Sequence, residues 1–406
     1  TATDANNSVT NTTYDAEDRP RVTSEAFGTG DARASKVVSR DKLGNPVEVM
    51  DFEGNITRTE YNALYLPKKV IDPAPFDSQA TETTYYKTGK VRRVKDRRGY
   101  ATTYEHDALG REIRVSDARN QTIETAYDKA GNVKTVKDKR GIVTANFYDD
   151  LYRLVRTEKA GVRLVVNEYD DVGNLVAVTD ANGNRTGYSY NGRNLLDTTI
   201  FADGTTEKRA YDGVGNLKTL TNEEGKVTTY EYDRENRQTL VEFAGEVTTK
   251  LYDAVGNLIS VTKPEGNCRV MAYDRFNRLI TVVDDPTGPI GTMTALDARF
   301  TRSDGLHMVT HYEYDANDNL RRQYDARGNH VEFTHDELNR KTRHIQHKAT
   351  GNLITRYTAY DEEGNLKEMV DPKGQRFTYS YDELNRKIDA YYPDVASPCH
   401  KITHIH

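Results

Sequence analysis

The chain has 406 residues, of which 36% are hydrophobic and 30% are charged, and its mean hydropathy is −0.82. This composition is too polar for an ordinary compact domain and suggests disorder, but 27 tyrosines, a residue that favours ordered strands, argue against disorder. The net charge of −6 comes from interspersed acidic and basic residues, so nucleic acid is not expected as a partner.

Two cysteines, Cys268 and Cys399, are too few and too far apart for a disulfide framework or a zinc motif. The sequence has no run of about 18 apolar residues, so it does not predict a membrane-spanning helix. The chain begins at Thr1 without a signal peptide, which suits an excised or processed piece of a longer protein.

A Tyr-Asp turn unit recurs along the whole chain. We number each copy, or arm, by its anchor, the residue in the Asp position. The seventeen anchors in chain order are Asp15, Asp41, Asn62, Tyr86, Asp107, Asp128, Asp149, Asp170, Asn191, Asp212, Asp233, Asp253, Asp274, Asp315, Asp336, Asp361 and Asp382. From 86 to 233 every step between anchors is 21 residues.

Two kinds of arm alternate without a break, giving a super-period of about 42 residues. GN-type arms read like YDDVGNL at Asp170, and NR-type arms read like YDELNR at Asp382. Every step that starts at a GN-type anchor is 21 residues, whereas every irregular step starts at an NR-type anchor. The longest step contains an insertion at 284–310. We expect the turns inside the fixed steps to line a packed edge where neighbouring turns of a spiral meet, and the variable loops to project into solvent.

The chemistry of the anchor predicts a tight turn. An Asp side chain accepts hydrogen bonds from backbone N–H groups downstream, and Gly or Asn tolerates the left-handed conformation that a hairpin needs. Further turn signals follow GN-type anchors about ten residues on, at Asp96, Asp138, Asp180, Asn222, Asp325 and Asp371. Each arm is therefore two strands and two turns of an antiparallel meander.

The tyrosines, aspartates, glycines, asparagines and arginines of the clearest arms are expected to be structural rather than catalytic. These residues of the repeat motif are Tyr127, Asp128, Gly131, Asn132, Tyr169, Asp170, Gly173, Asn174, Tyr211, Asp212, Gly215, Asn216, Tyr232, Asp233, Arg237, Tyr252, Asp253, Gly256, Asn257, Tyr273, Asp274, Arg278, Tyr381, Asp382 and Arg386. Pairs such as Tyr230 and Tyr232 share a strand face and are expected to form cross-strand aromatic ladders. An aromatic platform for sugars is the alternative.

Seventeen arms predict roughly 34 strands and a sheet on the order of 160 Å wide. Twisted open sheets rarely exceed about ten strands without curling or splitting. The wall is therefore expected to be all-β and to close into a hollow or spiralling shell. A parallel β-helix and an eight-bladed propeller fit the spacing less well, because turns recur every ten residues and the motif is not a propeller signature.

The segments YDAVGNLISV (252–261), YEYDRENR (230–237) and YSYDELNRKI (379–388) resemble the Rhs/YD-repeat family. That family includes bacterial Rhs polymorphic toxins, the C component of Tc insecticidal toxins, wall-associated YD-repeat proteins and teneurins. The resemblance covers about Thr10 to Pro393. We expect residues 1–393 to form one continuous YD-repeat sheet and 394–406 to be an irregular tail. It implies a β-sheet that spirals into a cocoon, which in toxin members encloses a C-terminal toxic domain.

The resemblance implies a secreted or surface-exposed bacterial protein without catalysis of its own. Its partners would be an enclosed toxin domain of the same polypeptide or operon and a delivery apparatus. The alternative is a cell-surface adhesion or carbohydrate-binding module, as in teneurins. No cargo domain follows Pro393, so we expect an internal stretch of wall or an orphan shell protein. The sequence Asp371-Pro372-Lys373-Gly374 resembles the family's self-cleavage motif, but it lies in register with other turns and is interpreted as one of them.

No metal, cofactor or catalytic site is expected. Three groups have the spacing of metal ligands, but a structural role is expected for each: Cys399 with His400, His404 and His406; His330 with His335, His344 and His347; and the calcium-loop-like runs Asp180-Asn182-Asn184 and Asp315-Asn317-Asn319. A recurrent arginine follows the NR-type turns and predicts a ladder of ion pairs and cation–π contacts, with a charged lumen for an unfolded guest as the alternative. Its members are Arg19, Arg111, Arg153, Arg237, Arg278, Arg340 and Arg386.

Overall fold

The computed structural model describes residues 1–284, 309–348, 350–392 and 400–403. These residues form 36 β-strands and no helix, so none of them belongs to a helix that could cross a membrane. The strands are β1 Ala2–Thr3, β2 Val9–Tyr14, β3 Pro20–Glu25, β4 Arg33–Arg40, β5 Pro46–Met50, β6 Ile56–Tyr61, β7 Pro67–Ile71, β8 Ala80–Tyr85, β9 Val91–Lys95, β10 Ala101–His106, β11 Glu112–Ser116, β12 Thr122–Tyr127, β13 Val133–Lys137, β14 Val143–Tyr148, β15 Leu154–Lys159, β16 Val162–Tyr169, β17 Leu175–Asp180, β18 Arg185–Tyr190, β19 Leu196–Ile200, β20 Thr206–Tyr211, β21 Leu217–Thr221, β22 Val227–Tyr232, β23 Gln238–Phe243, β24 Glu246–Tyr252, β25 Leu258–Thr262, β26 Cys268–Tyr273, β27 Leu279–Asp284, β28 Val309–Tyr314, β29 Leu320–Tyr324, β30 His330–His335, β31 Lys341–Gln346, β32 Leu353–Tyr360, β33 Leu366–Val370, β34 Arg376–Tyr381, β35 Lys387–Tyr392 and β36 His400–Thr403.

Each strand pairs antiparallel with the strands that precede and follow it in sequence, from β1–β2 to β35–β36. Strands β2 to β35 flank the seventeen anchors two by two, as the repeat predicts. One part of the expected tail is not irregular, because β36 pairs with β35. The reason is that an uncovered last strand offers a row of unpaired N–H and C=O groups to the chain that follows it.

The meander gives the sheet two long edges with different turns. We call the edge that carries the anchors the anchor edge, and the edge that carries the turns between arms the connecting edge. The ladder shifts register just before most anchors, for example between Glu231 and Tyr232. Such a bulge increases the local twist and bends the strand. A shift of this kind recurs in arm after arm and is consistent with a sheet that curls.

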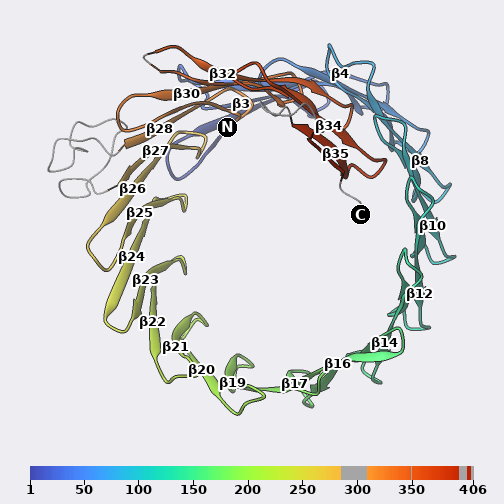
Figure 1. Cartoon of the computed structure of the whole chain (residues 1–406), viewed down its shortest axis with the longest axis vertical. Coiled ribbons are helices and arrows are strands. Elements are labelled where there is room, and N and C mark those ends of the chain that lie inside the picture. Colours follow the sequence, from blue (N-terminus) through green and yellow to red (C-terminus); the bar gives the residue numbers. More distant parts are fainter. Residues whose placement is uncertain (285–308, 349, 393–399, 404–406) are drawn as a thin grey trace.

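The sheet curls into an open ring one layer thick, and its two ends overlap (Figure 1). A single layer leaves few positions away from solvent, and the buried apolar residues among those described are small in number and size: Ala26, Ala177, Val270, Ala272, Val283 and Ala390. The expected fold class, a spiralling hollow shell of tandem antiparallel hairpins, is therefore confirmed. Its low hydrophobic content follows from having two solvated faces.

The overlap brings residues far apart in sequence to the same place. In Figure 1 the strands β3 and β4 overlap β30, β32 and β34. Three contacting pairs, Arg33 with Asp318, Arg97 with Glu363 and Arg119 with Asp382, are separated by 285, 266 and 263 residues. One circuit of the spiral therefore takes that much chain. We call the line of contact the seam; it joins the connecting edge of the first circuit to the anchor edge of the second.

Candidate functional site

The NR-type turn is held by one carboxylate. At Asp233, Oδ1 accepts hydrogen bonds from the backbone N–H groups of Glu235 and Arg237, and Oδ2 accepts one from Arg237 Nε at 2.6 Å. Asn236 has a φ of 62°, in the left-handed region that asparagine tolerates. The same Nε–Oδ2 bond, at 2.6–2.8 Å, joins the arginines at 19, 111, 153, 237, 278, 340 and 386 to their own anchors.

The GN-type turn uses the same carboxylate with other partners. Asp212 Oδ1 accepts from the backbone N–H groups of Val214 and Asn216, and Oδ2 accepts from Asn216 Nδ2 at 3.0 Å. Gly215 has a φ of 106°, which requires a residue without Cβ strain. The residues expected to form these turns thus lie at the anchor edge and contact one another.

Neighbouring arms are joined along the anchor edge by two different links. From a GN-type arm to the next NR-type arm, one asparagine donates to another: Asn216 Nδ2 lies 2.9 Å from Asn236 Oδ1. The other four such pairs are Asn174–Asn194, Asn257–Asn277, Asn319–Asn339 and Asn365–Asn385. In each pair the acceptor is the left-handed asparagine of the NR turn.

From an NR-type arm to the next GN-type arm, the link is the arginine. Arg237 Nη1 donates to the carbonyl of Asp253 at 2.9 Å, and its guanidinium lies 4.9 Å from the ring centroid of Tyr252. The same stacking, at 4.4–5.0 Å, joins Arg111–Tyr127, Arg153–Tyr169, Arg278–Tyr314 and Arg340–Tyr360. These contacts agree with the ladder interpretation of the recurrent arginines.

The two links give a physical reason for the alternation of arm types. A GN-type arm supplies an asparagine donor, which needs a left-handed asparagine in the arm that follows. An NR-type arm supplies an arginine, which needs a carbonyl and a tyrosine in the arm that follows. The alternation is visible in the sequence, but its cause is not. The available signal was the Asn-Arg pair itself, since both residues recur together in the NR-type arms at Asp233, Asp274, Asp336 and Asp382.

The anchor tyrosines tie each arm to the one before it through their hydroxyl groups. Tyr232 donates to the carbonyl of Leu217 at 3.0 Å. The other twelve that donate to a backbone carbonyl of the preceding arm are Tyr61, Tyr85, Tyr127, Tyr148, Tyr169, Tyr190, Tyr211, Tyr252, Tyr273, Tyr314, Tyr360 and Tyr381. The expected ring-on-ring ladder is wrong for them: no two of these described rings form an aromatic pair. Successive anchors lie two strands, or about 10 Å, apart, so a guanidinium fills the gap in five arms.

Removing one such hydroxyl tests the tie. We expect Tyr232→Phe to lower the free energy of unfolding by about 1 kcal/mol, the net value of a typical hydrogen bond. Tyr230→Phe is the matched control, because within the described residues the Tyr230 hydroxyl has no hydrogen-bond partner. Urea denaturation of both variants measures the difference, and equal losses would show that the hydroxyl of Tyr232 contributes nothing.

Many anchor aspartates have a pKa below the ordinary value. For Asp15, burial works in the opposite direction, but hydrogen bonds from Arg19 and Glu17 lower the pKa to about 2. At Asp107 the guanidinium of Arg111 is the main cause of the lowered pKa, and at Asp128 the amide of Asn132 is. Charge-assisted hydrogen bonds favour the ionised carboxylate.

These shifts predict acid sensitivity. A carboxyl group whose pKa is lower in the folded state stabilises the fold above its unfolded pKa, about 3.9, and loses that contribution as the pH falls through the folded value. We expect the urea concentration at the unfolding midpoint to decrease as the pH is lowered from about 4 to about 2, which is the folded pKa of Asp15. At the alkaline end, burial raises the pKa of Tyr360 to about 12, so its contribution is lost as the pH rises from about 10 towards 12. A midpoint that stays constant from pH 5 to pH 2 would contradict the acid prediction.

The seam is polar and carries arginines on one side. Arg119 Nη2 lies 2.9 Å from Asp382 Oδ2 and its Nε lies 2.8 Å from Glu383 Oε2. Arg98 Nη1 donates to the carbonyl of Asp382 at 3.0 Å and lies 3.5 Å from Asp361 Oδ2. The first circuit thus presents cations to the anchor carboxylates and carbonyls of the second circuit.

Arg33 makes the densest set of seam contacts. Its Nη1 lies 2.6 Å from Asp318 Oδ1 and 2.6 Å from the carbonyl oxygen of Ala316. Its guanidinium lies between two rings, 4.4 Å from the centroid of Phe52 and 4.1 Å from that of Phe276. Burial opposes the charge, but the carboxylates of Asp318 and Glu25 raise the pKa of Arg33.

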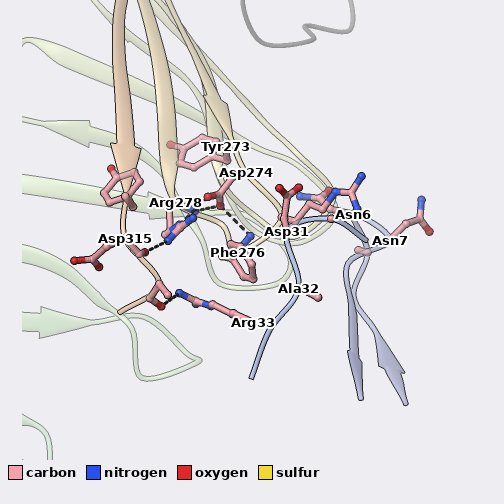
Figure 2. Close-up of a pocket in the computed structure, with 15 residues that line it drawn as sticks. Asn6, Asn7, Asp31, Ala32, Arg33, Tyr273, Asp274, Phe276, Arg278 and Asp315 are labelled. Carbon is pink, nitrogen blue, oxygen red and sulfur yellow. Dashed lines mark hydrogen bonds and ion pairs between the residues drawn. The ribbon is translucent and has the colours of Figure 1, made fainter. Parts of the chain in front are cut away.

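A cavity of about 900 Å³ opens next to Arg33 where the seam begins. Figure 2 shows Asn6, Asn7, Asp31, Ala32 and Arg33 of the first circuit facing residues of the second. The labelled residues of the second circuit are Tyr273, Asp274, Phe276, Arg278 and Asp315. Charges of both signs line it, and they already form ion pairs with one another, as Arg278 does with Asp274.

The expectation that fixed-step turns meet a neighbouring circuit holds for Asp51, whereas the expectation that irregular steps project into solvent is wrong for Phe76. Asp51, in a fixed-step turn, contacts the second circuit through Asn317. Phe76, in an irregular step, does so as well, since its ring lies under the guanidinium of Arg340 at 4.5 Å. An antiparallel meander puts every turn between arms on the same connecting edge, so both kinds meet the seam. Most of the 284–310 insertion, residues 285–308, lies outside the described residues.

The calcium-like runs and the cleavage-like motif are turns. Asp180 Oδ1 accepts from the backbone of Asn182 and Asn184, and Asp315 does the same in its own turn. Asp371 accepts from the N–H groups of Lys373 and Gln375, as the other turns between arms do. Their carboxylates are thus occupied by the protein's own backbone.

The four central histidines do not form one group. His335 lies near Asp315 and His344 stacks on Phe333 at 5.2 Å, and burial lowers the pKa of both. His330 and His347 come together instead, with ring centroids 4.1 Å apart. Cys399, His404 and His406, and the side chain of His400, lie outside the described residues.

Comparison with known proteins places this architecture. A family model of the teneurin YD-shell matches residues 105–288, and a model of the RHS repeat matches residues 85–122, 314–352 and 360–394. No curated protein matches the chain. The solved structure of TcdB2-TccC3 without its hypervariable C-terminal region is 15% identical, with a TM-score of 0.50 over 99% of this chain and 27% of that one. The structure of TcdB2-TccC3-TEV is 13% identical, with a TM-score of 0.49 over 98% of this chain and 28% of that one.

The chain is therefore a YD-repeat shell, built from a single sheet with an interlocked anchor edge. Its sequence resembles the Rhs/YD-repeat family through these two models, the longer of which covers residues 105–288. It spans 27–28% of the length of these two solved structures.

Proposed function

We propose that this chain is part of the wall of a shell that encloses a toxic effector domain and shields it until delivery. The observation that supports the proposal is the single-layer sheet that curls into a ring and overlaps itself (Figure 1). Such a wall has no large core of its own, and it surrounds a space. The fold likeness to TcdB2-TccC3, solved without its hypervariable C-terminal region, supports the same kind of assembly.

The proposed role is structural and not catalytic. The anchor carboxylates and arginines are engaged by their own turns and by neighbouring arms, which leaves them to hold the wall rather than to react. The partners would be the effector domain of the same polypeptide or operon and a delivery apparatus. The protein would be secreted or displayed by a bacterium.

Protease protection of the gene product that contains this stretch tests the proposal. We expect a non-repeat effector segment to resist protease in the intact protein and to become cleavable in an Arg33→Ala/Arg119→Ala variant with a loosened seam. Cleavage as fast as that of the isolated effector would contradict shielding. A glycan array with hits that are lost on Tyr→Ala changes would favour the adhesion or carbohydrate-binding role instead.

A further inference from the structure

Two histidines and one glutamate meet at the connecting edge, at the open end of the hairpin β30–β31 whose anchor is Asp336. His330 begins β30, and His347 follows β31 directly and donates its backbone N–H to the carbonyl of His330 at 3.2 Å. Glu332 stands two residues after His330 on the same strand face. Potential ligand atoms of the three side chains all lie within 4.8 Å of one another.

One atom of this cluster lacks a partner. His347 Nε2 is buried and has no hydrogen-bond partner within the described residues, and the nearest carboxylate oxygen, Glu332 Oε2, is 3.8 Å away. Buried polar atoms nearly always have a partner, so an orphan of this kind points to a bound ion or water. A cavity of about 320 Å³, which His330, His347, Asp325 and Lys348 help to line, adjoins the cluster and provides room for solvent.

The repeat itself does not require these side chains. The residues that start the corresponding strands after the other fixed-step turns are Ile56, Ala101, Val143, Arg185, Val227, Cys268 and Arg376. A histidine at 330 with a second histidine directly opposite departs from the pattern. Departures from an otherwise consistent repeat are where functional sites are expected.

We propose that His330, Glu332 and His347 bind a zinc-type divalent transition-metal ion. Two imidazoles and one carboxylate are the donor set of open zinc sites, and they suit neither calcium nor magnesium, which prefer oxygen ligands. The ion would join β30 to the segment after β31 and satisfy the orphan nitrogen of His347.

Binding requires a local rearrangement of the rings. The imidazoles are stacked with an angle of 25° between their planes, and an ion must lie near both ring planes. Rotation about the terminal torsion of histidine is soft, so this change is small in energy. Arg322 Nε lies 3.3 Å from Glu332 Oε2 and orients the carboxylate, but with Lys348 nearby it also adds positive charge that weakens the site.

Zinc titration of the purified full chain by calorimetry tests the site. We expect the number of zinc ions bound per chain to fall by one in His330→Ala and His347→Ala, and Glu332→Gln to bind that ion at least tenfold more weakly. His347→Phe keeps a stacked ring but removes both nitrogens, and it should lose the same ion. Because the tail residues from Cys399 to His406 offer donors of their own, the difference between variants is the criterion rather than the total.

His335→Ala and His344→Ala are the matched controls, since both residues belong to the same hairpin and lie outside the cluster. They should keep the ion, and urea midpoints should show that every variant is folded. The proposal is overturned by the absence of zinc binding, by an unchanged stoichiometry and affinity in a folded His347→Phe variant, or by an equal loss in the two controls.

Discussion

Replacing Arg33 with alanine is expected to open the ring at the seam while most of the sheet stays folded. The Arg33 side chain is 10% exposed and bridges Asp318, Glu25 and two aromatic rings. Removing one partner of a buried ion pair costs about 3–5 kcal/mol, and we expect about 2–3 kcal/mol because Asp318 is partly exposed. The strands are hydrogen-bonded only to their neighbours in sequence, so the loss falls on the overlap rather than on the ladder.

Small-angle scattering and urea denaturation measure the two consequences. The radius of gyration of Arg33→Ala should increase, while the β-sheet circular dichroism should change little. Arg33→Lys should give an intermediate result, because lysine keeps the charge but cannot form a fork or stack between two rings. Arg234→Ala, at an exposed arginine of another turn, is the control and should leave both quantities unchanged. A compact Arg33→Ala protein would show that other seam contacts suffice.

The turns and strands could be predicted from the sequence because their chemistry is local. At Asp233 the carboxylate reaches donors only two and four residues away, so a five-residue motif contains the whole interaction. The number of flanking strands and the antiparallel order followed from counting such motifs. The curl of the sheet followed from strand number alone, since a flat sheet of that width is not stable.

The seam could not be predicted because nothing local marks its members. Arg33 and Asp318 are 285 residues apart, and Arg33 lies in an irregular step that looked like a solvent-exposed loop. Which arms meet depends on how many residues one circuit takes, and this in turn depends on the twist added at each bulge. The pairing of His330 with His347, rather than with His335, also depends on a register that the repeat motif does not specify.

Replacing Asp382 with alanine is expected to have the largest effect of a single anchor substitution. Asp382 is 5% exposed and accepts hydrogen bonds from the backbone N–H groups of Leu384 and Arg386, from Arg386 Nε, and from Arg119 across the seam. Burial alone would raise the pKa of Asp382, but the hydrogen bonds from Arg386 and the charge of Arg119 outweigh it and lower the pKa below the ordinary value. The carboxylate is therefore charged at neutral pH. We expect a loss of about 3 kcal/mol, because several donors lose their acceptor together.

Asp382→Asn separates the turn from the seam. Asn191 is a natural anchor in this chain, and its Oδ1 accepts from the N–H groups of Arg193 and Leu195, so an asparagine at 382 should keep the turn. It removes the charge that faces Arg119 and Arg386, and it places an Nδ2 donor where Oδ2 accepted from both guanidinium groups. In a double-mutant cycle we therefore expect Asp382→Asn and Arg119→Ala to be strongly non-additive, whereas Asp382→Ala should cost more than Arg119→Ala alone. If Asp382→Asn destabilises the protein as much as Asp382→Ala, the charge rather than the turn geometry dominates, and the anchor aspartates act mainly as ion-pair partners of arginines.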